Sequence, residues 1–175
     1  MSEHENIDLV AFQRRLNESL EGLHAGGSGA ELIGFRSGGR GWLARLDDLS
    51  EIESLPPAEK IFRLALAKDW VGGLASFKGA IHTVVDFQGF LGGPPTREGP
   101  GARALIIHPR HGIQAALLVG EVAGLISSES LIAVEADGSG LPWAKARRRT
   151  PDGEVWTMIE MGALAGSEEM INIGK

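Results

Sequence analysis

The chain has 175 residues, of which 43% are apolar and 23% are charged, an ordinary balance for a globular protein with its own core. Its formal net charge of −6 argues against a nucleic-acid partner, because binding a phosphate backbone needs a basic surface. No apolar run approaches the roughly 18 residues of a membrane span. The acidic N-terminus does not fit a secretory signal. The absence of cysteine excludes disulfides and is compatible with a cytoplasmic location.

The first segment has the period of an amphipathic helix. Between Ile7 and Leu23 the apolar residues recur at spacings of three and four, with charged residues on the other face. The glycine-rich run at 26–29 then predicts a helix end and a flexible linker. We therefore expect residues 1–29 to form a helix and linker ahead of a domain at 30–175. The helix could pack on that domain or bind a partner, and both alternatives stay open.

After the linker the apolar period changes from about 3.6 to 2, which predicts strands. We expect strands at residues 32–36, 42–46, 71–77, 81–85, 104–108, 113–119, 121–126 and 155–161. Apolar residues at 49, 52 and 55 precede two prolines, and the segment 58–69 fits either a short helix or a loop. Many short strands between glycine-rich turns indicate a mainly β fold, either barrels or a sandwich.

Short helices and loops complete the prediction. Asp86 is placed to cap a short helix at 87–91, which the Gly-Gly-Pro-Pro run at 92–95 would end. The connection at 136–153 is rich in glycine, proline and charge. Its three arginines at 147–149 could meet an acidic partner, but an isolated run of three charges favours the interpretation as solvated loop. A second short helix is expected at 163–170.

Catalytic and metal-binding patterns are weak throughout the chain. The five histidines are scattered, and only His108 and His111 lie close together, with no carboxylate or cysteine at ligand spacing. A surface hairpin is the favoured interpretation of that pair. The sequence contains neither a Gly-x-Ser-x-Gly nucleophile turn nor a phosphate-binding Gly-x-x-x-x-Gly-Lys loop. We therefore expect no enzymatic activity, no cofactor and no metal.

Several short motifs follow one another in an order that is more informative than any one of them. They are the hairpin at 42–46 followed by LSEIES, then LASFKG, TVVDF, LLVGEV and EVWTMIEMGALAGSEEM. In this order the chain resembles the CheW family of chemotaxis coupling proteins over nearly its whole length beyond the linker. More narrowly, IGFRSGGR, the Trp70 start and FQGFLGG are similar to the PilI branch, which serves the chemosensory systems of type IV pilus twitching motility.

The resemblance implies a fold and a role. The fold would be two SH3-like, five-stranded β-barrel lobes that share a hydrophobic core. The role would be that of a cytoplasmic adaptor between the signalling tip of a chemoreceptor and the regulatory domain of a CheA-type histidine kinase. It would reach membrane-associated receptor arrays through its partners, without inserting into the membrane. By position, the resemblance implies a receptor- or kinase-binding site made of Leu49, Glu51, Phe77, Lys78 and Gly79.

Four positions differ from the family pattern. Lys78 replaces an arginine, Ser76 an asparagine, Thr83 a proline and Gly120 an acidic residue. Lysine cannot make the planar two-point contact with a carboxylate that arginine makes. Asp86 keeps the family residue, and a helix cap is favoured over a contact role for it.

A second functional class stays open. A small β-barrel module could bind a ligand or an oligonucleotide, unrelated to signalling. The acidic charge and an aromatic content of 6% weigh against the oligonucleotide version.

Overall fold

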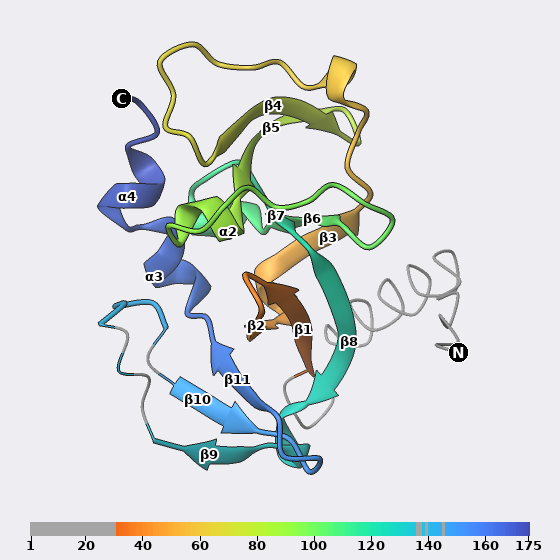
Figure 1. The fold of residues 1–175 in the computed structure, drawn as a ribbon, viewed down its shortest axis with the longest axis vertical. Helices are drawn as coiled ribbons and strands as arrows, with labels where there is room; N and C mark the ends of the chain where they lie inside the picture. The colour runs from red at the N-terminus through yellow and green to blue at the C-terminus, as the bar shows by residue number, and fades with distance from the viewer. Residues whose placement is uncertain (1–30, 136–137, 139, 145) are drawn as a thin grey trace.

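The computed structural model describes residues 31–175 except 136, 137, 139 and 145. Within these residues the chain forms two β-sheets with short helices at their margin (Figure 1). The predicted helix and linker at residues 1–29 lie outside the described part of the chain.

The first sheet has six strands in the order β8-β1-β2-β11-β10-β9. Its strands are β1 (Glu31–Ser37), β2 (Arg40–Arg45), β8 (Glu121–Ser127), β9 (Ile132–Val134), β10 (Ala146–Arg149) and β11 (Val155–Met158). Only β2 and β11 run parallel, and the other neighbours pair antiparallel. The sheet has one strand more than the five expected for a lobe.

Strand β10 corrects the interpretation of the three arginines as solvated loop. Arg147, Arg148 and Arg149 pair with both β9 and β11. Pairing with two neighbouring strands satisfies the backbone of this polar segment, and tertiary context overrides its weak strand propensity.

The second sheet has five strands in the order β3-β6-β7-β5-β4. Its strands are β3 (Leu49–Glu53), β4 (Val71–Phe77), β5 (Ala80–Asp86), β6 (Arg103–Ile107) and β7 (Ala115–Val119). Strands β5 and β7 are parallel, and β4–β5 and β6–β7 are antiparallel hairpins. Strands β3 and β4 are therefore the two outer edges of this sheet.

The hydrophobic core lies between the sheets and is shared by them. In β7, Leu117 and Val119 face the shared core, whereas Ala116 and Leu118 face a smaller cluster inside the second lobe. A third cluster, which includes Leu43, fills the first lobe. Burial on both faces of each sheet gives two lobes around one common core, which confirms the predicted architecture.

Aromatic rings occupy the centre of the shared core. Phe87 packs edge-on against Phe35 and Trp42, with ring centroids 5.7 and 5.2 Å apart, and Trp143 lies 5.8 Å from Trp42. Such edge-to-face pairs contribute beyond the area they bury. They join β1 and β2 of one sheet to the residue that follows β5 of the other.

One short helix follows β5 of the second sheet, and two others lie near the end of the chain. Helix α2 (Phe87–Phe90) is capped by Asp86, which accepts a hydrogen bond from the backbone N–H of Gly89 at 3.3 Å. This confirms the cap. The predicted helix at 163–170 is instead two helices, α3 (Met161–Ala165) and α4 (Glu168–Ile171), because the Ser167 hydroxyl caps α4 by accepting from Met170 N. Among the described residues, four 3₁₀ turns connect other elements: η1 (Leu46–Asp48), η2 (Ala58–Lys60), η3 (Pro109–His111) and η4 (Ser128–Ser130).

Residues 54–70, which we name the strap, run from β3 to β4 and arch over the outer side of β4 (Figure 1). After η2 the strap is irregular, so both alternatives predicted for 58–69 occur in part. Phe62 and Leu74 exchange backbone hydrogen bonds of 2.8 Å in both directions. Near its other end, Leu66 O accepts from Lys175 N at 2.7 Å. The strap therefore covers part of the outer edge of β4, which would otherwise be open to pairing.

Candidate partner-binding surface

The turn between β4 and β5 presents a lysine at its tip. Phe77 and Ala80 are the last paired residues, so the loop has only two residues, Lys78 and Gly79. Both have positive φ, 48° and 83°, the pattern of a type I′ turn. Glycine adopts this conformation freely, whereas a lysine seldom does. The turn therefore projects the Lys78 side chain, 62% exposed, beyond the end of the hairpin.

Lys78 joins the two outer edges of the second sheet. Its Nζ lies 3.1 Å from Glu51 Oε1 and 3.5 Å from Glu53 Oε1, and both glutamates belong to β3. Because β3 and β4 sit at opposite ends of the strand order, these contacts require the sheet to curl until its edges meet. We name Glu51, Glu53 and Lys78 the seam cluster.

A β-bulge in β3 sets which side chains reach the surface. The register against β6 shifts between Leu49 and Glu51. A bulge inserts one extra residue and breaks the strict alternation of faces. As a result, Leu49 and Ile52, three residues apart, both point into the core at 2% and 7% exposure. Glu51 and Glu53 are left at the surface beside the turn.

Burial and mutual contacts within the seam cluster shift the pKa values of Glu53 and Lys78. Removal from water raises the pKa of Glu53 above 4.5, assisted by a hydrogen bond with Glu51 and opposed by the Lys78 charge. The hydrogen bond to Glu51 raises the pKa of Lys78 above 10.5, against a smaller opposing effect of desolvation. Lys78 is therefore a firmly held cation that two carboxyl groups share.

The structure brings together three of the five residues implied by the resemblance. Glu51, Lys78 and Gly79 lie at the surface of the seam. Leu49 and Phe77, 2% and 6% exposed, lie beneath it and support it from the core. The sequence analysis missed Glu53. Its position two residues after Glu51 on a strand places it on the same face, which is the pattern that could have identified it.

His111, one of the two neighbouring histidines, has a carboxylate neighbour that the sequence did not reveal. Asp48 Oδ1 accepts from Arg110 at 2.5 Å and lies 2.9 Å from His111 Nε2. Asp48 is buried, and these contacts fasten the η3 turn to the start of β3. In the part of the chain that the structure describes, no group of three His, Cys, Asp or Glu residues could hold a metal ion. The cluster is therefore assigned to holding the turn.

Comparison with known proteins gives a family match. The model of the CheW-like domain matches residues 31–169, which includes both sheets. The chain is similar to Protein PilI of Pseudomonas aeruginosa, with 29% identity over 119 residues. That alignment covers 68% of this chain and 65% of the relative, slightly less than two thirds of its length.

A solved structure shares the fold. The scaffolding protein TtCheW from Thermoanaerobacter tengcongensis superimposes with a TM-score of 0.62 at 16% identity, over 75% of this chain and 89% of the other. At this identity the likeness concerns the fold, and it supports the two-lobed architecture. Among the described residues, no helix has the length and apolarity that crossing a membrane requires.

Proposed function

This chain belongs to the family of CheW-like domains, and from that premise we propose that it is an adaptor that couples chemoreceptors to a CheA-type histidine kinase. The similarity to PilI supports a narrower assignment, the chemosensory signalling that governs type IV pilus twitching motility. In this proposal the protein works in the cytoplasm and joins membrane-associated receptor arrays through its partners.

The seam cluster is the observation that carries the proposal. It contains Glu51 and Lys78, two residues that the resemblance to the family implies for the receptor-binding surface, and it combines an exposed cation at the tip of the β4–β5 hairpin with two carboxyl groups on β3. Exposed ion pairs contribute only about 0–1 kcal/mol to stability. The arrangement is therefore better explained by recognition than by folding, since charges at an interface rim select partners and set their register.

The chemistry of the seam fits an adaptor rather than an enzyme. Its side chains offer one ammonium group, two carboxyl groups and a supporting apolar layer beneath. The raised pKa of Lys78 keeps its amine protonated, which makes it a poor nucleophile. Lys78 can act as a point charge toward an acidic residue of the receptor tip, and its three donors turn more freely than the fixed fork of an arginine.

Co-sedimentation tests the proposed coupling. The full chain is mixed with a receptor signalling fragment assembled on vesicles, with the regulatory domain of a CheA-type kinase, or with both. The proposal expects the chain to pellet with the receptor fragment and to bring additional kinase domain with it. Absence of binding to either partner at concentrations that saturate a known coupling protein would contradict the proposal and favour a ligand-binding module.

A further inference from the structure

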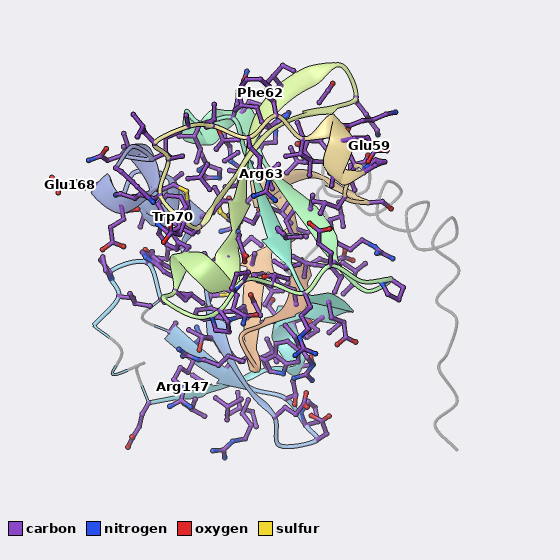
Figure 2. The ribbon with its side chains drawn as sticks, turned by 45° about the horizontal axis from the view of Figure 1, so that its top comes forward. Glu59, Phe62, Arg63, Trp70, Arg147 and Glu168 are labelled. Atoms are coloured by element: carbon purple, nitrogen blue, oxygen red, sulfur yellow. The ribbon has the colours of Figure 1, made fainter. Side chains whose placement is uncertain are left out.

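A small groove lies at the opposite end of the molecule from the β4–β5 turn. Figure 1 shows β4 and β5 at the top and β9, β10 and β11 at the bottom, and in Figure 2 Arg147 lies at the lower end, far from Phe62 on the strap. The groove has a volume of about 280 Å³. The lining residues that matter here are Arg36, Arg40, Arg147, Glu154, Trp156 and Thr157. We name it the arginine groove.

Strand pairing gathers the three arginines from distant parts of the chain. Arg36 lies one residue before the end of β1, and Arg40 begins β2 after the glycine turn that joins the two strands. The parallel pairing of β2 with β11 places Thr157 beside Trp42, and β10 then places Arg147 beside Thr157. Three guanidinium groups therefore converge on one end of the first sheet, in a protein with a net charge of −6.

Two of the three arginines of the groove, Arg36 and Arg40, are held in place before any partner arrives. The guanidinium of Arg36 lies 4.8 Å from the ring centroid of Trp156, and that of Arg40 lies 4.7 Å from Trp42. Arg40 also donates to Thr157 Oγ1 at 3.4 Å. Cation–π stacking orients the planar fork of an arginine and reduces the entropy lost when it binds.

The groove already contains one example of carboxylate binding. Arg36 NH2 contacts both carboxylate oxygens of Glu154, at 3.0 and 3.1 Å. The four charged side chains that line the groove thus include three cations and one anion. Arg147 is half-buried in this lining, and no described residue forms an ion pair with it.

We propose that the arginine groove binds a carboxylate side chain from an acidic segment of a protein partner. Arginine forks match the geometry of a carboxylate, and a volume of about 280 Å³ admits one or two side chains. A nucleic acid fits poorly, because Trp156 is only 3% exposed and cannot stack with a base, and the net acidic charge repels a long polyanion. This surface is distinct from the seam cluster and does not depend on the proposed receptor contact.

Nuclear magnetic resonance of the tryptophan indoles tests the proposal on the full chain. Trp156 lines the groove and Trp42 lies beneath Arg40, whereas Trp70 packs against Phe90 elsewhere. The probe is a capped tetraglutamate peptide at low salt, and a capped tetralysine peptide is the control. We expect saturable shifts of the Trp156 and Trp42 indole N–H signals with tetraglutamate, no shift of Trp70, and no response to tetralysine.

Two variants with equal change in charge locate the binding. Arg147→Gln should weaken tetraglutamate binding about tenfold, since it removes charge-assisted hydrogen bonds. Arg149→Gln, on the same strand but outside the lining, should leave the affinity within about twofold. Thermal melting of both variants checks that each is folded.

Three outcomes would overturn the assignment. They are the absence of a saturable shift at Trp156, equal weakening by Arg149→Gln and Arg147→Gln, and tighter binding of inorganic phosphate than of tetraglutamate. The last would identify a small-anion site instead. Because the probe is a synthetic peptide, none of these results depends on whether the chain couples a receptor to a kinase.

Discussion

Lys78 occupies a backbone conformation that most residues avoid. Its φ of 48° lies in the left-handed region, where a Cβ costs about 1 kcal/mol, whereas asparagine adopts it more readily. A lysine at this point of a type I′ turn lowers the stability of the fold, but it places a cation at the tip of the hairpin. Retention of charge at a strained position is expected of a residue that serves recognition.

The backbone cost at Lys78 can be measured separately from its charge. Lys78→Ala and Lys78→Asn both remove the ammonium group, but only asparagine suits the left-handed conformation. We expect Lys78→Asn to be more stable than Lys78→Ala by about 0.5–1 kcal/mol in urea denaturation. Equal stabilities would show that the turn is not strained by its side chain.

Glu53 gives the seam cluster a dependence on pH. Its raised pKa means that the folded state favours the protonated carboxyl group, mainly because the group is removed from water. The contribution of that group to stability is complete below the unfolded value of about 4.5 and is lost as pH rises through the raised pKa.

The stability of the Glu53→Gln variant relative to the wild type should therefore increase as pH rises. The difference in free energy of unfolding between Glu53→Gln and the wild type should increase from pH 4.5 toward neutrality, because the variant has no carboxyl group to ionise. Urea denaturation at a series of pH values measures this difference. A difference that stays constant, or falls, over this range would contradict the desolvation of Glu53.

At the scale of elements, the strap and β4 depend on a single glycine. Gly73 has φ of 125°, and a Cβ added there would lie 2.4 Å from the carbonyl oxygen of Phe62. The close approach permits the paired hydrogen bonds between Phe62 and Leu74 that hold the strap on the edge of β4. The strap thus covers the outer edge of β4 through an isolated β-bridge and not through a continuous ladder of backbone hydrogen bonds.

Gly73→Ala should release the strap from the sheet. We expect a loss of about 2–3 kcal/mol and faster tryptic cleavage after the exposed Arg63. Gly79→Ala is the matched control, because Gly79 also has positive φ but has open space around its Cα. It should cost about 1 kcal/mol without faster cleavage after Arg63. Similar cleavage in both variants would show that the strap is held by other contacts.

Asp86 has a structural role, since it connects helix α2 to the loop that contains Thr96. Beyond capping α2, it accepts hydrogen bonds from the Thr96 N–H at 2.8 Å and the Thr96 hydroxyl at 2.5 Å. Asp86→Ala should lower stability by about 2 kcal/mol, since it removes a cap and charge-assisted bonds from a buried group. At temperatures where the variant is folded, its receptor affinity should match the wild type. A selective loss of affinity would instead assign Asp86 to the contact surface.

Local patterns predicted the elements that depend on local physics. The alternation in β4 and β5 and the cap at Asp86 are both encoded within a few residues. Strand β10 was missed because its arginines pair only when β9 and β11 flank them. The break between α3 and α4 depends on the Ser167 cap, which the helical period of the segment conceals.

At the scale of the whole molecule, the shared core fixes two surfaces at opposite ends. The aromatic centre joins the sheets through Phe87, and the seam cluster and the arginine groove lie on different lobes. The sequence placed Glu51 and Lys78 in one site only through family resemblance, since 26 residues separate them. The curl of the second sheet that brings them to 3.1 Å depends on pairing between distant strands, which a local pattern does not contain.

We propose that Lys78 serves binding rather than folding, and the decisive measurement is the affinity of the receptor signalling tip for Lys78→Glu. Sedimentation titration should show at least about tenfold weaker binding than the wild type, since a like charge replaces an attractive one at the contact. The melting temperature should fall by no more than about 4 °C. Lys78→Arg should keep the affinity, and Arg149→Glu, a charge reversal on the other sheet, should leave receptor binding unchanged. Wild-type affinity in Lys78→Glu would contradict the account.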